Sequence, residues 1–203
     1  EIRYTFFESL HAAGKGQLIV TAHQQEDVIE TTLFRIFRGS GLKGLQGIPA
    51  RTEKLIRPLL HSTRAAILAY AQTNNVPFRH DASNDKTTYT RNFIRHEMLP
   101  LLESRFPEFG HRMTANITRW QEAYLLYEER VAFYKKKLMQ WRGMDVYIPL
   151  RKLEQLPARG TLLYECLHPY GFSADQAQEA LRLMEQQSGA QMESATHRLI
   201  RHR

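Results

Sequence analysis

The sequence predicts an α/β fold with a parallel sheet in its first half, followed by a mainly helical second region. A short apolar run at residues 18–20 is typical of a strand buried in a parallel sheet, and a helical pattern over residues 25–37 follows it directly. Beyond residue 107, apolar residues recur every three or four positions to about residue 140, which indicates one long amphipathic helix. We therefore expect two domains, over residues 1–104 and 105–203.

In the first region, apolar spacing, glycine and proline predict the remaining elements. The chain opens in a helical pattern, and glycines at positions 39, 41, 44 and 47 break regular structure after the second helix. A strand or extended segment over residues 51–60 leads into a helix over residues 63–75, which ends at residues 76–78 around Pro77. A polar loop at residues 80–88 then precedes a helix that carries Arg91, Asn92 and Arg95.

The second region continues after the long helix with short elements. Ser173 and Gln176 have the spacing of a capping box, and Gly189 is a natural helix terminator. The expected elements are a strand at residues 146–150, a helical turn at 153–156, a helix at 161–168 stopped by Pro169 and Gly171, a helix from the capping box to about residue 187, and a strand from residue 193 onward.

Composition excludes several classes of protein. The chain has a formal net charge of +7, which favours a polyanionic partner such as nucleic acid, although a mildly basic protein is often simply soluble. Its one cysteine, Cys166, permits neither an internal disulfide nor a Cys-x-x-Cys site. No apolar run approaches the roughly 20 residues of a membrane span, and this sequence does not open on the basic-then-apolar pattern of a signal peptide, so we predict a cytoplasmic protein.

The most informative stretch places His23, Asp27 and Glu30 at the junction between the predicted strand and the predicted helix that follows it. Asp27 and Glu30 fall on one helical face, and ligands of open α/β sheets bind beyond the carboxyl ends of the strands. Three interpretations stay open. The carboxylates could stabilise the helix start through its dipole, ligate a metal together with His23, or form a pocket for a cation such as a substrate amine.

Arg91 and Arg95 are four residues apart, so one helical face can present both guanidinium groups. They could form surface salt bridges with Glu97, Asp81 or Asp85. Alternatively, they could recognise phosphate, ribose or base edges, for which a planar fork of donors is well shaped.

Several motifs together resemble one family. The stretches are residues 23–31 (HQQEDVIET), 38–45 (RGSGLKGL), 57–60 (RPLL), 81–84 (DASN) and 91–95 (RNFIR) followed by Leu99-Pro100. In this order they resemble the signature of the tRNA(Ile)-lysidine synthetase family. Gln24 and Glu26 depart from it, since the family has a second histidine and an aspartate at these positions.

The resemblance implies a PP-loop ATP pyrophosphatase domain followed by a helical domain that grips tRNA. It implies ATP and Mg²⁺ as cofactors, and L-lysine and the CAU-anticodon tRNA(Ile) as partners, in a reaction that joins lysine to C2 of the wobble cytidine through an adenylated intermediate. We predict that Asp27 and Glu30 bind lysine, that one of them takes its proton, and that His23 assists. Arg38 and Ser40 complete the predicted substrate site, and Arg91, Asn92 and Arg95 line its nucleotide and tRNA side.

The family begins with a phosphate-cradling Ser-Gly-Gly-x-Asp-Ser loop, which this sequence lacks, and continues into a further C-terminal domain. We therefore expect a fragment that adenylates nothing unaided. Three alternatives are another PP-loop tRNA-modifying enzyme such as a cytidine thiolase, a non-catalytic tRNA-binding fragment, and a metal-dependent hydrolase. A homodimer is a further expectation. No residue is assigned to a protein-bound metal.

Overall fold

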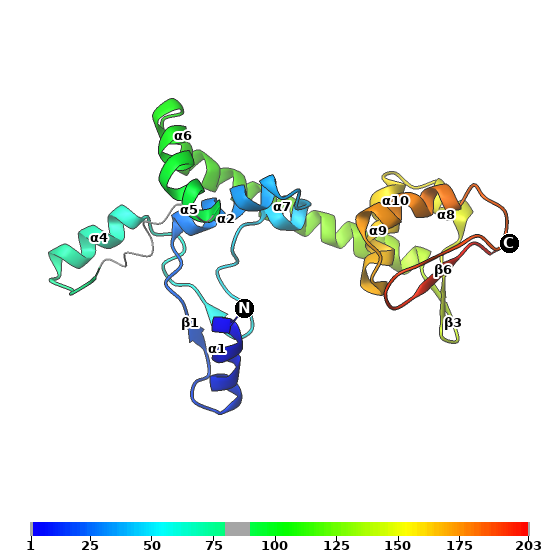
Figure 1. Cartoon of the computed structure of the whole chain (residues 1–203), viewed down its shortest axis with the longest axis horizontal. Helices are drawn as coiled ribbons and strands as arrows, with labels where there is room; N and C mark the ends of the chain where they lie inside the picture. Colours follow the sequence, from blue (N-terminus) through cyan, green and yellow to red (C-terminus); the bar gives the residue numbers. More distant parts are fainter. Residues whose placement is uncertain (1, 80–89, 203) are drawn as a thin grey trace. The chain divides into compact units, whose positions relative to one another are not determined.

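The computed structural model describes residues 2–79 and 90–202 (Figure 1). The chain forms two compact units, residues 1–124 and residues 125–203. The domain boundary expected at residue 104 stays a prediction. The predicted loop at residues 80–88, with the motif at 81–84, lies outside the described residues.

The first unit combines helices with one pair of parallel strands. In chain order it contains α1 (Ile2–Ala12), β1 (Ile19–Val20), α2 (Gln25–Phe37), α3 (Leu42–Leu45), β2 (Leu55–Ile56), α4 (Arg64–Thr73), α5 (Thr90–Phe93), the π-helical turn η2 (Ile94–Met98), α6 (Leu99–Arg105) and the first part of α7 (Phe109–Leu138). The α/β class with short parallel strands is thus confirmed.

The predicted strand exists but is not buried. Ile19 pairs with Leu55 and Val20 pairs with Ile56 in a parallel register. Val20 is nevertheless 62% exposed. Among the described residues β1 pairs with β2 alone, so few neighbours cover its side chains and the expectation of a fully buried strand was wrong.

Helix α2 has the predicted bounds and forms the centre of the first unit's core. Ile29 and Leu33 are buried, as the helical spacing predicts, whereas Ile36 and Phe37 are exposed. The core also contains residues from four other segments, and its buried members are Val28, Ile29, Leu33, Ile48, Leu60, Ile94, Met113 and Ile117. The face of α2 that carries Ile29 is therefore covered by the helical run of residues 90–105 and by the start of α7.

The glycine-rich break after α2 contains a short helix, α3, that the sequence did not predict. Gly47 has a positive φ of 67°, and a Cβ there would lie 2.6 Å from Val28 Cγ1, so this close approach needs glycine. Arg35 on α2 donates to the Gly47 carbonyl at 2.6 Å. The loop is thus held against α2.

The second unit is mainly helical, as predicted. After the end of α7 it contains β3 (Gln140–Arg142), β4 (Asp145–Tyr147), α8 (Leu150–Glu154), α9 (Arg159–Leu167), the 3₁₀ turn η3 (His168–Tyr170), α10 (Ala174–Leu183), β5 (Gln191–Glu193) and β6 (Arg198–Ile200). Both strand pairs are antiparallel. Leu138, Leu153 and Cys166 are among the most buried residues of its core. Burial also raises the pKa of the Cys166 thiol, which keeps it protonated and inert.

Several boundaries in this unit differ from the prediction. The turn predicted at residues 153–156 is the helix α8, and the strand predicted from residue 193 onward is replaced by the pair β5 and β6. Helix α7 ends at Leu138, because residues 140–142 pair with β4 across a turn at Gly143, whose φ is 63°. Helix α10 ends at Leu183 rather than near residue 187. No helix in the described ranges is long and apolar enough to cross a membrane.

The predicted capping box of α10 is confirmed. Ser173 Oγ accepts from the Gln176 backbone at 3.2 Å, and Gln176 Oε1 accepts from the Ser173 backbone at 2.9 Å. Ser173→Ala removes the first of these bonds, so we expect it to lower the free energy of unfolding by about 1 kcal/mol in urea denaturation. Ser9→Ala, at an exposed serine within α1, is the control and should change stability by less than about 0.5 kcal/mol. Equal effects of the two substitutions would contradict the capping role.

Candidate active site

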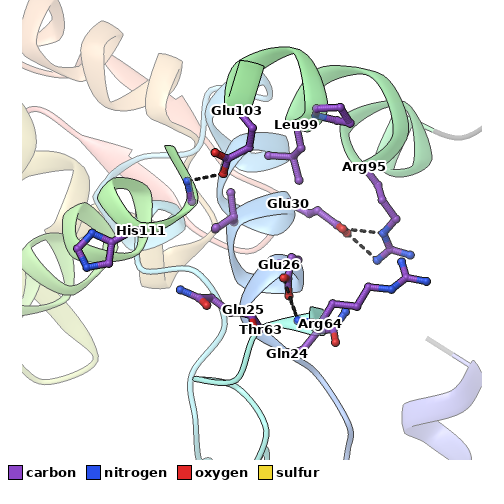
Figure 2. Close-up of a pocket in the computed structure, with 13 residues that line it drawn as sticks. Gln24, Gln25, Glu26, Glu30, Thr63, Arg64, Arg95, Leu99, Glu103 and His111 are labelled. Atoms are coloured by element: carbon purple, nitrogen blue, oxygen red, sulfur yellow. Dashed lines mark hydrogen bonds and ion pairs between the residues drawn. The ribbon is translucent and has the colours of Figure 1, made fainter. Parts of the chain in front are cut away.

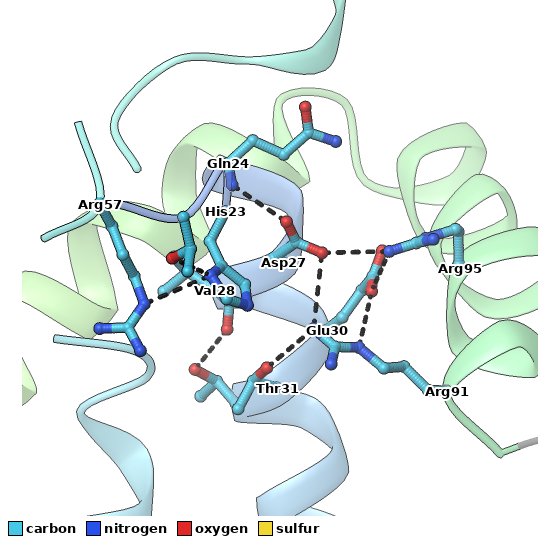
Figure 3. Close-up of polar contacts among 11 residues, drawn as sticks. His23, Gln24, Asp27, Val28, Glu30, Thr31, Arg57, Arg91 and Arg95 are labelled. Carbon is cyan, nitrogen blue, oxygen red and sulfur yellow. Dashed lines mark hydrogen bonds and ion pairs between the residues drawn. The ribbon is translucent and has the colours of Figure 1, made fainter. Parts of the chain in front are cut away.

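Two acidic residues of α2 and two arginines of the facing helical run form one ion-pair cluster (Figure 3). Arg95 donates two hydrogen bonds to Glu30, from Nε to Oε1 at 2.6 Å and from Nη2 to Oε2 at 2.8 Å. Arg91 Nε donates to Glu30 Oε2 at 3.2 Å. The nearest oxygen of Asp27 lies 3.1 Å from Arg95 Nη2 and 3.5 Å from Arg91 Nη2. The sequence motifs at residues 23–31 and 91–95 therefore meet in space.

Glu30 is the buried centre of this cluster. Its side chain is only 1% exposed, whereas those of Asp27, Arg95 and Arg91 are 15%, 23% and 46% exposed. The hydrogen bond from Arg95 to Glu30 raises the pKa of the Arg95 guanidinium, against the lowering effect of its own burial. A buried carboxylate with a two-donor arginine partner is held in a fixed orientation, and so is the arginine.

Asp27 has two tasks. Its Oδ2 accepts from the Gln24 backbone N–H at 3.0 Å, which satisfies an amide at the start of α2. Its Oδ1 faces the arginines. The helix-start interpretation thus accounts for one oxygen of Asp27 but for no oxygen of Glu30.

The other interpretations of the acidic residues can be compared with the same contacts. Two carboxylates and two guanidiniums leave the cluster without a net negative charge, so it is not by itself a receptacle for a free cation. Within residues 2–79 and 90–202, no group of three or more His, Cys, Asp or Glu side chains could hold a metal ion. Arg91 and Arg95 pair with Asp27 and Glu30 rather than with Glu97. Asp81 and Asp85 lie outside the described residues.

His23 lies next to the cluster and is held by a third motif. Its Nδ1 lies 2.9 Å from Thr21 Oγ1 and accepts from Arg57 Nε at 3.3 Å. Arg57 is buried and also donates to the Pro49 carbonyl at 2.7 Å. Because a guanidinium can only donate, Nδ1 is the unprotonated nitrogen of this ring.

A pocket of about 520 Å³ borders the other side of Glu30 and Arg95 (Figure 2). It is lined by Gln24, Gln25, Glu26, Ile29, Glu30, Thr63, Arg64, Arg95, Leu99, Pro100, Glu103, Gly110 and His111. Neither His23 nor Asp27 is part of its wall. Glu30 and Arg95 therefore belong to both the ion-pair cluster and the pocket.

Sequence reasoning missed several residues of this pocket. Both carboxylate oxygens of Glu26 accept from the Arg64 backbone N–H, at 2.9 and 3.0 Å, and so cap the start of α4. Glu103 likewise accepts from the Gly110 backbone at 2.7 Å, near the start of α7. The only sequence signal at Glu26 was its departure from the family pattern. Nothing in the sequence marked Glu103 or His111.

The structure does not bring Arg38 and Ser40 to the cluster. Arg38 follows the last turn of α2, and the eleven positions from Asp27 correspond to about 16 Å of helix. Its guanidinium lies over the Phe34 ring at 4.6 Å, and the exposed Ser40 donates its backbone N–H to the Arg35 carbonyl. Asn92 follows Arg91 on α5 and is half-buried. The predicted substrate-binding residues thus lie at two places, and their roles stay predictions.

Comparison with known proteins agrees with this arrangement. The model of a family described as "PP-loop domain" matches residues 1–102, and that of a family described as "TilS substrate binding domain" matches residues 142–203. The parallel strand pair, the acidic helix after β1 and the first of these matches define a PP-loop protein.

Similarity to individual curated proteins narrows the assignment from the PP-loop class to one family. The tRNA(Ile)-lysidine synthase of Porphyromonas gingivalis W83 is 35% identical over 211 aligned residues, which cover this whole chain and 44% of that protein. The synthases of Parabacteroides distasonis and Chlorobaculum tepidum are 32% and 37% identical, over 100% and 71% of this chain and 46% and 43% of those proteins. The chain belongs to the tRNA(Ile)-lysidine synthase family, as its motifs predicted. It spans about half the length of the curated relatives it matches.

Proposed function

We propose that this chain is part of a cytoplasmic ligase that joins the ε-amine of lysine to C2 of the wobble cytidine in the CAU-anticodon tRNA(Ile). In this reaction the C2 carbonyl oxygen of the cytidine attacks the α-phosphate of ATP, and pyrophosphate leaves. The lysine amine then attacks C2, AMP departs and one proton is lost from the nitrogen. The observation that carries the proposal is the alignment of the whole chain with a tRNA(Ile)-lysidine synthase, together with the two family matches at residues 1–102 and 142–203.

The ion-pair cluster supports different roles for its two carboxylates. Glu30 is fully buried and committed to Arg95, so its role in the proposal is to orient that guanidinium. Asp27 is the more exposed carboxylate, and its contact with Arg91 is the longest in the cluster at 3.5 Å. Arg91 is therefore the partner that a lysine ammonium would displace from this oxygen in the proposal. In the proposal Asp27 therefore holds the amine and receives its proton, and His23 next to it assists.

The arginines supply the anion-binding side of the proposed site. Arg95 uses Nε and Nη2 on the carboxylates, and among the described residues its Nη1 has no hydrogen-bond partner. This nitrogen is available to a phosphate or to the developing charge at the cytidine, and Arg91 and Asn92 lie on the preceding helix α5. The described residues contain no group of three or more acidic, histidine or cysteine side chains that could hold a metal ion, so Mg²⁺ enters the proposal only as the companion of the ATP phosphates. A homodimer stays a prediction.

The proposal is tested with the complete protein, ATP, radiolabelled lysine and a tRNA(Ile) transcript. We expect label to enter the tRNA only when ATP is present, with AMP and pyrophosphate released in equal amounts. A transcript with uridine in place of the wobble cytidine is the matched control and should remain unlabelled. Absence of labelling with the cytidine transcript, or labelling without ATP, would contradict the proposed activity.

The role of Asp27 has its own test. Asp27→Asn keeps an oxygen for the Gln24 backbone N–H but removes the charge that meets the lysine amine. We expect kcat/KM for lysine to fall about a hundredfold or more, because the variant loses both the contact with the amine and the group that takes its proton, with KM for tRNA unchanged. Asp175→Asn, which changes an aspartate in the first turn of α10, should leave both constants unchanged. A lysine KM and kcat that match those of the unmodified protein would remove Asp27 from the amine site.

A further inference from the structure

The helical run that carries the two arginines is not uniformly α-helical. Between α5 and α6, residues 94–98 form a π-helical turn, and the Leu99 backbone N–H donates to the Ile94 carbonyl five residues earlier. Arg95 lies inside this turn. Such turns are rare in proteins and occur mostly as single wide turns within α-helices, frequently at functional sites.

Pro100 provides a local reason for the wide turn. It occupies the first turn of α6 and has no backbone N–H, so it cannot donate to the His96 carbonyl four residues earlier. Its ring would also collide with that carbonyl if the α-helix continued without interruption. An α-helical geometry is therefore unfavourable at this point, and a wider turn relieves the collision.

The wide turn affects how the arginines are aligned. With 3.6 residues per turn, a residue four positions further along an α-helix lies about 40° past the first around the axis. The wide turn covers residues 94–98, so it changes the direction of Arg95, while Arg91 lies on the α-helical turn before it. Both in fact reach the same carboxylate, since Arg91 Nε and Arg95 Nε lie 3.2 and 2.6 Å from the two oxygens of Glu30. Ile94 is fully buried beside them and anchors the turn in the core.

We propose that Pro100 is a positioning residue that maintains the π turn and thereby aligns Arg91 and Arg95 on Glu30. That Pro100 maintains the turn follows from the contacts of Leu99, Ile94 and Glu30. That the turn matters for catalysis rests on the proposed function, in which Arg95 faces the nucleotide or cytidine.

The structural part is tested by crystal structures of the complete protein and of its Pro100→Ala variant. Alanine restores the N–H and removes the ring, so we expect Leu99 to donate to the Arg95 carbonyl in the variant and the Arg95 guanidinium to leave Glu30. An unchanged bond from Leu99 to Ile94 with unchanged ion pairs would overturn the proposal. Pro100→Ser restores the same N–H and serves as the second variant should the alanine protein not fold.

The kinetic part is tested by lysidine formation. We expect Pro100→Ala to lower kcat/KM by about tenfold or more, because displacing a positioning group by about 1 Å costs this much. Pro169→Ala, at the equivalent first-turn proline of η3 in the second unit, should stay within about twofold. Equal activities of the two variants would count against the role of Pro100.

A double-mutant cycle separates positioning from a general structural effect. If Pro100 acts through the Glu30 ion pairs, Pro100→Ala should cost less than about twofold in a Glu30→Gln background, where those pairs are already weakened. A full additional tenfold loss in that background would overturn the proposal. If the unmodified protein makes no lysidine, the proposed function fails, whereas the crystal structures still decide whether Pro100 sets the turn.

Discussion

Replacing Glu30 with alanine should destabilise the protein by about 3 kcal/mol, the lower end of the cost of breaking a buried ion pair. Glu30 is fully buried and accepts from both Arg91 and Arg95, so its removal leaves the arginines facing each other across Asp27 alone. The cost stays at the lower end because Arg95 is 23% exposed and can turn towards water. Urea denaturation followed by circular dichroism measures the change in the free energy of unfolding.

The same substitution should lower lysidine formation by about a hundredfold or more, the usual cost of losing a preorganised charge at a reacting centre. Binding of tRNA should change little, because Glu30 lies too deep to contact a polynucleotide. Glu30→Gln keeps the volume of the side chain and should lose less stability than alanine. Glu108→Ala is the control, since its contact with Arg112 is exposed and 3.8 Å long, and it should cost less than about 0.5 kcal/mol. If Glu30→Ala resembled this control, the buried pair would have no structural importance.

Helix α2 shows what a periodic pattern can predict. Its bounds agree with the predicted range of about residues 25 to 37, because Ile29 and Leu33 repeat at helical spacing and Gly39 follows its end. Ile36 and Phe37 continue the same helical spacing, and yet they are exposed. A pattern gives the direction in which a side chain points, but the neighbours that cover it come from distant segments. The same reason explains the exposed Val20 on β1.

The position of the acidic residues could also be predicted, but their partners could not. Asp27 and Glu30 lie 61 to 68 positions before the arginines that bind them. Sequence spacing carries no information about such contacts, so the motif at residues 91–95 was expected to have local acidic partners or a ligand. The pairing explains why arginine suits these positions: a planar fork can bind a carboxylate on one edge and keep donors on another.

The π turn and the pocket residues were beyond prediction for different reasons. Pro100 was visible in the sequence, but proline in a helix permits a kink, a break or a wide turn, and packing selects among them. Glu26 and Glu103 each cap a helix that begins elsewhere in the chain, at Arg64 and Phe109. Neither glutamate occupies the capping position of the helix that it caps, so a search for local capping patterns does not find these contacts.

Replacing Arg95 with alanine should cause the largest loss of activity, about a hundredfold to a thousandfold in kcat/KM. Arg95 is the residue that joins the ion-pair cluster to the pocket, with two donors on Glu30 and one nitrogen free of partners in the described part of the chain. Its removal takes away the proposed donor to substrate and leaves Glu30 with Arg91 as its remaining charged partner. Steady-state lysidine formation with varied ATP and tRNA measures the effect.

Comparison of Arg95→Lys with Arg95→Ala separates charge from geometry. Lysine keeps the positive charge near Glu30 but cannot reproduce the two-donor grip, so it should recover most of the stability and little of the activity. Arg112→Ala, at an exposed arginine of α7, is the matched control and should leave both unchanged. If Arg95→Lys restored full activity, a point charge would suffice and the fixed orientation of the guanidinium would have no catalytic part. If Arg95→Ala kept activity within about threefold, the nucleotide side of the site would have to be sought elsewhere, because a preorganised donor should cost far more than this when removed.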